Sequence, residues 1–232
     1  GGFYVEDEGA HLIPLLLDPQ PGDIVLDACA APGGKSTHVA ALMQNKGLIY
    51  AVDRKEARLN LARSNCHRLG VRIVEPIMGD IRQPRVWVPL VTAARPPSVK
   101  QARMGEPSID RILVDAPCSG LGVLRRHPEA KWRKDAQALP RHQALQCQIL
   151  ESVASCLRPG GVLVYSTCST EPEENEDVIE RFCRAHTEFQ RESVVSWLPS
   201  VAQGFVTEHG ALATVGNRFS MDGFYAARLR KV

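Results

Sequence analysis

Short apolar runs typical of strands alternate with longer helical patterns along most of this chain. Parallel strands need a crossover connection, so this alternation predicts an α/β protein with a mostly parallel sheet. Ligands of such doubly wound sheets bind beyond the carboxyl ends of the strands. Helices, expected on both faces of the sheet, are predicted at 35–45, 56–69, 140–157 and 173–186. The predicted seven strands lie at 24–26, 48–52, 71–77, 109–114, 162–165, 189–195 and 223–229.

The length of 232 residues suits one large domain. We expect a single domain over 1–232, in which residues 1–22 lead into the first strand. Residues 83–108 contain five prolines and four basic residues, and we expect them to form an irregular insertion. The chain begins with Gly instead of Met, which favours a fragment whose missing part lies upstream.

Composition argues against several classes of protein. No apolar run approaches the roughly 18 residues that span a bilayer, and the first residues show neither a basic leader nor an apolar signal core. The seven cysteines include no C-x-x-C pair, which argues against a metal site and against a secreted disulfide framework. We therefore expect a cytoplasmic monomer without a membrane anchor and without a metal.

The net charge of +2 neither requires nor excludes a nucleic-acid partner, but the cations are unevenly distributed. The stretch 125–134 holds five cations, one carboxylate and a tryptophan. Cations neutralise phosphates and an aromatic ring can stack on a base, so this stretch is a candidate RNA surface. A solvated loop that leads into a helix explains the same pattern equally well. The candidate RNA-binding residues are Arg125, Arg126, Lys131, Trp132 and Lys134.

A loop of small residues joins the first predicted strand to the first helix. It reads Asp27-Ala28-Cys29-Ala30-Ala31-Pro32-Gly33-Gly34-Lys35. Its two glycines let a ligand approach the backbone closely, and the following helix offers free N–H groups. The loop lacks the spaced glycines of a dinucleotide-binding loop. It also has Cys29 where a P-loop needs glycine, so neither of these nucleotide sites is expected.

Carboxylates follow the next two predicted strands. Asp53 ends the second strand, where a carboxylate can accept hydrogen bonds from both hydroxyls of a ribose. Asp80 follows the third strand and can accept from an adenine amino group. Each aspartate alone is as well explained as a helix cap or a turn residue. The ordered set of Asp27, the glycine loop, Asp53 and Asp80 favours an adenosyl ligand without a phosphate, S-adenosylmethionine.

Two cysteines occupy polar turns directly after predicted strands. Cys118 follows the fourth strand and Cys168 follows the fifth. If these two strands are neighbours, both thiols lie at the edge of the sheet that holds the glycine loop. Cys29 is expected to form a wall of that loop. The other cysteines are expected to be small core residues, and they are Cys66, Cys147, Cys156 and Cys183.

A thiol beside a methyl donor suits methylation at carbon 5 of a pyrimidine. Carbon 5 is a poor nucleophile, but addition of a thiolate to carbon 6 gives an enamine-like species that attacks the methyl group. The thiolate is the reactive form, so the site must favour it. The carboxyl group of Asp115 can hydrogen-bond N3 and the exocyclic amine of cytosine. Spacing alone does not decide whether Cys118 or Cys168 is the nucleophile.

These motifs, in this order, resemble the Nop/Sun family of RNA cytosine-5 methyltransferases over nearly the whole chain. The segment RRHPEAKW is most similar to the bacterial Sun-type enzymes that modify 16S ribosomal RNA. The resemblance implies a Rossmann-like, S-adenosylmethionine-dependent methyltransferase fold. It rests on DACAAPGGK (27–35), Asp53, Asp80, DAPCSG (115–120), RRHPEAKW (125–132), STCSTEPEEN (166–175) and MDGFYAA (221–227).

By this resemblance, Cys168 is the nucleophile and Cys118 assists release of the methylated product. Ribosomal RNA is the implied partner, and an RNA-binding domain is expected upstream. Glu6 stands where the family often has Gln, and no role is assigned to it. The residues implied to contact S-adenosylmethionine are Cys29, Ala30, Ala31, Pro32, Gly33, Gly34, Lys35, Asp53, Asp80 and Asp115.

Two other functions stay open. One is the same chemistry on transfer RNA, and the other is an RNA-binding ribosome-assembly factor that has lost catalysis. The intact cysteines and aspartates argue against the second. An amino-group methyltransferase is disfavoured, because Asp115-Ala116-Pro117 leads to Cys118 instead of the aromatic residue that follows a D/N-P-P run in those enzymes.

Overall fold

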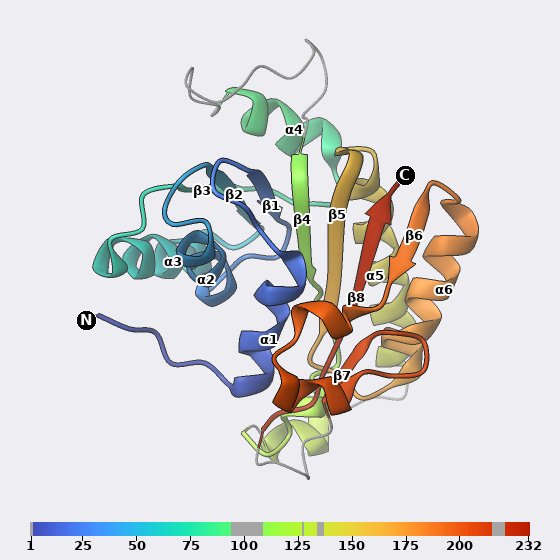
Figure 1. Ribbon diagram of the computed structural model, residues 1–232. Helices are drawn as coiled ribbons and strands as arrows, with labels where there is room; N and C mark the ends of the chain where they lie inside the picture. Colours follow the sequence, from blue (N-terminus) through green and yellow to red (C-terminus); the bar gives the residue numbers. More distant parts are fainter. Residues whose placement is uncertain (1, 94–108, 127, 134–136, 215–220) are drawn as a thin grey trace.

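The computed structural model describes residues 2–93, 109–126, 128–133, 137–214 and 221–232. One sheet forms the centre, with strand order β3-β2-β1-β4-β5-β8-β6, and β7 pairs with β8. β1 to β5 are parallel, whereas β8 is antiparallel to β5, β6 and β7. The predicted mostly parallel α/β sheet is confirmed (Figure 1). The strands are β1 (Ile24–Asp27), β2 (Leu48–Asp53), β3 (Val74–Met78), β4 (Ile109–Asp115), β5 (Leu157–Thr167), β6 (Phe189–Glu192), β7 (Leu212–Thr214) and β8 (Phe224–Lys231).

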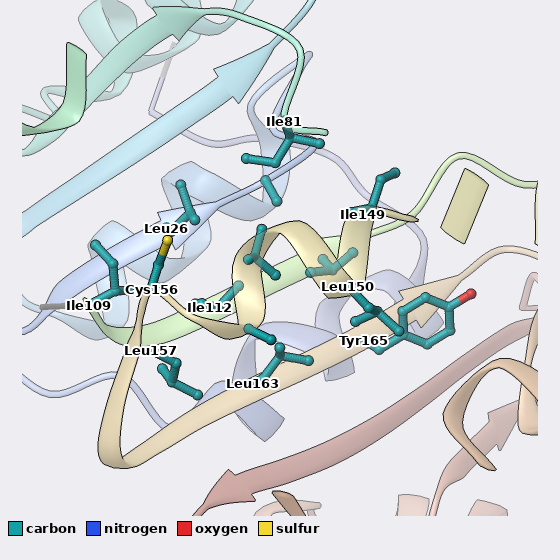
Figure 2. Packing of buried hydrophobic residues seen from close by; sticks show 14 of the residues in the cluster. Leu26, Ile81, Ile109, Ile112, Ile149, Leu150, Cys156, Leu157, Leu163 and Tyr165 are labelled. Atoms are coloured by element: carbon teal, nitrogen blue, oxygen red, sulfur yellow. The ribbon is translucent and has the colours of Figure 1, made fainter. Parts of the chain in front are cut away.

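Helices cover both faces of the sheet, as the sequence predicts. Successive strand residues point to opposite faces, so Leu26 and Ile112 belong to one buried cluster while Val25 and Leu113 belong to the other. α5 packs on the first cluster (Figure 2), and α1 and α2 contribute to the second. The α-helices are α1 (Glu8–Leu17), α2 (Gly34–Leu42), α3 (Glu56–Leu69), α4 (Pro84–Ala93), α5 (Ala138–Ala154) and α6 (Glu176–Ala185). Short 3₁₀ helices are η1 (Leu121–Val123), η2 (Pro128–Arg133), η3 (Pro172–Glu174), η4 (Val194–Trp197) and η5 (Ser200–Phe205).

The expected lead-in at 1–22 contains a helix that the sequence pattern did not predict. The Asp7 side chain caps α1 by accepting a hydrogen bond from the Gly9 N–H at 3.0 Å. Ile13 and Leu16 on its inner face are completely buried. Pro14 lies inside this helix and masks the helical pattern in the sequence.

The prediction that 83–108 is irregular is wrong for its first part. α4 begins at Pro84, a position at which the missing N–H of proline costs nothing. The side chain of Trp87 is completely buried, and its indole N–H donates to the Ile81 carbonyl at 2.8 Å. This burial stabilises the helix despite its prolines. Residues 94–108 lie outside the described part of the chain.

The described sheet has eight strands where seven were predicted. The additional strand, β7, has only three residues and pairs with β8 from Leu212 to Thr214. So short a run carries no readable alternation of apolar and polar residues. In the described part of the chain, none of the helices has the length and apolar character that crossing a membrane requires.

Candidate active site

The residues predicted to form the site gather at the carboxyl ends of the parallel strands. Asp27, Asp53 and Asp115 end β1, β2 and β4, and Cys168 directly follows β5. β1 lies between β2 and β4, so the direction of strand order reverses at β1. Ligands of doubly wound sheets bind at such a switch point. The residues therefore gather at the edge where the sequence predicts ligand binding.

Backbone hydrogen bonds fasten the glycine loop to both neighbouring strands. Ala28 N–H donates to β4 at 2.9 Å, and Ala30 N–H donates to β2 at 3.0 Å. Gly33 has φ 98°, a backbone conformation that strongly favours glycine. A Cβ at Gly33 would also lie only 2.9 Å from the Cβ of Ala62. α2 begins at the next residue, Gly34, so its free N–H groups face the loop.

A cleft of about 260 Å³ opens beside this loop. Asp53 and Asp80 line it from the ends of β2 and β3, and Pro117 lines it from the turn after β4. Asp53 accepts a hydrogen bond from the Lys55 N–H at 2.9 Å. Arg82 Nε donates to both carboxylate oxygens of Asp80, at 2.9 and 3.2 Å, and this contact lowers the pKa of Asp80. Both carboxylates are thus held in fixed orientations at the cleft.

Asp27 lies at a smaller hollow of about 60 Å³ that shares Cys29 with the cleft. Its Oδ2 accepts from Ser36 Oγ at 2.6 Å, whereas its buried Oδ1 has no hydrogen-bond partner among the described residues. Burial raises the pKa of this carboxyl group to about 7, against the opposing effect of the Ser36 hydrogen bond. A buried acceptor without a donor fits a cationic group of a ligand.

Lys35 lies at the same hollow and connects the glycine loop to β4. Its Nζ is 2.8 Å from Asp115 Oδ2, and Asp115 Oδ1 accepts from Ser166 Oγ at 2.8 Å. Burial by itself lowers the pKa of Lys35, but the carboxylate of Asp115 outweighs it and the pKa is raised. Lys35 therefore stays cationic at neutral pH. We call Lys35 and Asp115 the lysine–aspartate pair.

The two predicted thiols are in direct contact, because β4 and β5 are neighbours. The Sγ atoms of Cys118 and Cys168 are 3.3 Å apart. This contact raises the pKa of Cys118, helped by burial, and lowers the pKa of Cys168, helped by the cation of Lys35. Cys118 is therefore the member that keeps its proton, and Cys168 is the member that more readily becomes a thiolate.

Polar side chains that follow Cys168 fasten its turn. Thr167 Oγ1 donates to Asn175 Oδ1 at 2.5 Å, and Asn175 Nδ2 donates to the Ser169 carbonyl at 3.0 Å. The carbonyl of Cys168 accepts from the Gly122 N–H at 2.9 Å, which ties it to the turn that carries the other thiol. These residues of the 166–175 motif therefore hold the turn of Cys168 in place.

Two cations of the predicted RNA surface have partners inside the protein. Arg125 Nε lies 2.6 Å from Asp222, and Arg126 lies 2.6 Å from Asp7; each arginine also contacts the other aspartate. Asp222 is 2% exposed, whereas both arginines are half-exposed. We call these four residues the arginine cluster. It joins the start of α1 to the segment before β8, so both arginines already have carboxylate partners, and a role for them in RNA binding stays a prediction.

The rest of the predicted RNA surface is only partly described. Trp132 lies in η2 and is 84% exposed. The backbone of Lys131 belongs to the same short helix. Lys134 lies outside the described residues.

Several residues at the site carry no motif. Arg58 and Arg82 reach the cleft from α3 and from the turn after β3. The sequence around each of them does not distinguish it from an ordinary surface arginine. Leu145 and Ile149 of α5 close another wall of the cleft. Their i, i+4 spacing marks a buried helical face and is the signal that could have identified them. Within the described ranges, no group of three or more His, Cys, Asp or Glu side chains could hold a metal ion.

Comparison with known proteins decides the family. The model of the 16S rRNA methyltransferase RsmB/F family matches residues 14–230. A probable ribosomal RNA small subunit methyltransferase B from Synechocystis is 37% identical over 231 residues, which cover this whole chain and 48% of that protein. The Bacillus subtilis protein of the same description is 37% identical over 232 residues, with 100% and 48% covered. This chain belongs to the RsmB/F family. It spans about half the length of these relatives.

Solved structures agree with the RsmB/F assignment. PH0851 superimposes with a TM-score of 0.84 at 36% identity, over 98% of this chain and 47% of that one. NSun6 from Pyrococcus horikoshii, solved with SFG, gives a TM-score of 0.80 at 31% identity, over 99% and 53%. SFG is an analogue of S-adenosylmethionine, the methyl donor of this family. The Rossmann-like methyltransferase fold expected from the resemblance is thus confirmed.

The RsmB/F residues present here fit S-adenosylmethionine. The buried Oδ1 of Asp27, which has no partner among the described residues, suits the ammonium group of the methionine moiety. Asp53, 9% exposed at the cleft, suits the two ribose hydroxyls. These features fit a donor bound along the edge that also carries the thiols.

Proposed function

We propose that this chain is a catalytic domain that methylates carbon 5 of a cytosine in small-subunit ribosomal RNA. The observation that carries the proposal is the 3.3 Å contact between Cys118 and Cys168 beside the lysine–aspartate pair. Nitrogen and oxygen acceptors have lone pairs and need no covalent activation, whereas carbon 5 of a pyrimidine does. The relatives named small subunit methyltransferase B support ribosomal RNA as the substrate.

The chemistry begins with Cys168, the thiol whose pKa is lowered by its neighbours. Its Sγ forms a bond to carbon 6, and the electron pair of the carbon 5–carbon 6 double bond becomes available at carbon 5. S-adenosylmethionine, when bound, supplies the electrophilic methyl group that carbon 5 takes up. The proton on carbon 5 then passes to water, the electron pair of that C–H bond re-forms the carbon 5–carbon 6 double bond, and the bond from Sγ to carbon 6 breaks with its electron pair returning to the Cys168 thiolate.

The neighbouring groups of the chain divide the remaining tasks. Each carboxylate oxygen of Asp115 accepts one hydrogen bond, from Lys35 or Ser166, and retains a lone pair for the exocyclic amine of cytosine. The S–H group of Cys118 touches the sulfur that must leave. A hydrogen bond from Cys118 stabilises the departing thiolate of Cys168 and assists product release.

Two cysteine variants test this assignment. We expect Cys168→Ala to abolish methyl transfer from isotope-labelled S-adenosylmethionine while calorimetry shows that the donor still binds. Cys118→Ala should accumulate a protein–RNA adduct that survives denaturing electrophoresis, because release is slowed. Cys66→Ala, a buried core cysteine, is the matched control. Turnover by Cys168→Ala, or an adduct only in that variant, would overturn the assignment.

The same label distinguishes the substrates. Labelled 5-methylcytosine in 16S ribosomal RNA supports the proposal. Label in transfer RNA alone identifies transfer RNA as the substrate instead. Transfer of label to neither RNA identifies an assembly factor without catalysis. We include Trp132, Lys131 and Lys134 in the proposed RNA surface, since Trp132 is 84% exposed and an exposed indole is a surface on which bases stack.

A further inference from the structure

A buried carboxylate beside the two thiols has no part in the chemistry above. The side chain of Glu174 is completely buried. It accepts hydrogen bonds from the Ser119 N–H at 2.8 Å, from Ser119 Oγ at 2.5 Å and from Gln146 Nε2 at 3.3 Å. His142 Nδ1 lies 3.1 Å from it. A buried carboxylate is stable only with such donors around it.

These contacts connect Glu174 to the residues on either side of Cys118 in the sequence. Ser119, which follows Cys118, binds Glu174 directly. Gln146 Nε2 contacts Glu174 and also donates to the Pro117 carbonyl at 3.0 Å, so the residue before Cys118 is held as well. The position of the Cys118 thiol is therefore fixed from the Glu174 side.

The same contacts reach the second thiol-bearing turn. Ser119 Oγ lies 3.1 Å from Ser169 Oγ, and Ser169 directly follows Cys168. Glu174 thus holds the two turns together through one serine on each. The separation of the two Sγ atoms depends on this arrangement.

Charge is distributed unequally around the two thiols. The negative charge of Glu174 adds to the thiol contact and to burial in raising the pKa of Cys118. The positive charge of Lys35 instead contributes to lowering the pKa of Cys168. At the distances within one site, a single charge shifts such an equilibrium by an appreciable factor.

We propose that Glu174 is a positioning residue that acts through Cys118 and favours retention of the proton on that thiol. The inference rests on the proposed function, in which Cys168 must supply the thiolate. Without the carboxylate charge, Cys118 competes for the thiolate form and Cys168 loses part of it.

Alkylation of the free enzyme tests this without RNA or S-adenosylmethionine. Iodoacetamide is added in limiting amount, and mass spectrometry gives the rate at each cysteine. Wild-type protein should react faster at Cys168. In Glu174→Gln, which keeps the shape and removes the charge, the ratio of Cys118 to Cys168 reaction should rise roughly tenfold, as a change of about one pKa unit gives.

Controls separate charge from packing. Ser119→Ala removes a donor but leaves the carboxylate, so Cys168 should remain the faster thiol. Glu173→Gln changes the exposed neighbour of Glu174 and should leave the ratio unaltered. If Glu174→Gln does not fold, Glu174→Asp preserves the charge and should keep Cys168 faster.

An unchanged ratio in folded Glu174→Gln, or equal rates at the two thiols in Glu174→Asp, overturns the inference. Failure of the proposed function appears elsewhere, as turnover by Cys168→Ala. In methyl-transfer assays, Glu174→Gln should lower kcat and leave the KM for S-adenosylmethionine unchanged, because the carboxylate does not line the cofactor cleft. A rise in that KM with an unaltered kcat contradicts the proposed role.

Discussion

The lysine–aspartate pair and the arginine cluster are built from the same kinds of charge, but they leave different groups open. The lysine–aspartate pair lies at a hollow, and its carboxylate retains lone pairs at that hollow. In the arginine cluster, two cations and two carboxylates bind one another across segments far apart in sequence. The first arrangement suits chemistry and the second suits stability. A cation beside a motif is therefore no guide to function until its partners are known.

The largest effect is expected at Lys35. Lys35→Met keeps the length of the side chain and removes the cation that holds Asp115 and favours the Cys168 thiolate. Methyl transfer should fall at least about a hundredfold, the usual scale for loss of a group that assists proton or charge movement. The melting temperature should change less than activity does, because Met removes the cost of burying the Lys35 cation, while Asp115 stays 30% exposed and keeps its hydrogen bond from Ser166. Lys46→Met, at an exposed position, is the control. If Lys35→Met instead lost stability and kept its activity, the contrast between the two clusters would be contradicted.

In the arginine cluster, we expect the opposite result. Asp222→Asn removes the buried charge that both Arg125 and Arg126 bind. The free energy of unfolding should fall by about 3 kcal/mol, at the low end for a broken buried pair because the arginines stay half in water. Denaturant unfolding measures this, and S-adenosylmethionine binding should be retained. Glu180→Gln, from an exposed pair with Arg184, should cost at most about 0.5 kcal/mol. Loss of donor binding with intact stability would assign the cluster to the site.

A smaller effect that depends on pH is expected at Asp27. Its pKa is raised to about 7 in the folded protein, so between about pH 4 and pH 7 the folded form holds a proton that the unfolded form has released. Stability without ligand therefore falls as the pH rises through this window. Asp27→Asn has no such proton, and the fall should shrink by about 3 kcal/mol in urea titrations at the two ends. Asp177→Asn, an exposed carboxyl, should leave the slope as it is. Identical slopes for wild type and Asp27→Asn would contradict the raised pKa.

The sequence predicts the ligand edge of this fold well, for a physical reason. The predicted catalytic and cofactor-binding residues at that edge follow apolar runs closely. Parallel strands bring their carboxyl ends to one edge of the sheet, whatever segments connect them. Cys118 and Cys168 were placed at one edge on this basis, and they are in contact. The contact of Glu174 with Ser119 was not predictable in this way, because no periodicity relates a residue in a 3₁₀ turn to a side chain 55 positions away.

Other features were missed because local signals opposed them. Pro14 and the prolines of α4 argue against helices that burial nevertheless stabilises. The spacing of Arg125 and Arg126 suggests an RNA surface, and only the fold reveals that Asp7 and Asp222 lie beside them. Contacts between distant segments therefore account for most of what sequence patterns did not predict.

The position of β8 has a consequence for how the domain is synthesised. β8 is the latest strand in sequence, yet it lies inside the sheet between β5 and β6. The N–H of Gly223, just before it, donates to the Gly122 carbonyl at 2.8 Å, and Gly122 in turn holds the turn of Cys168. In a nascent chain on the ribosome, β5 and β6 thus lack their shared neighbour until this strand emerges. The turns of Cys118 and Cys168 acquire their final support only then, so the proposed chemistry requires that this strand has been synthesised.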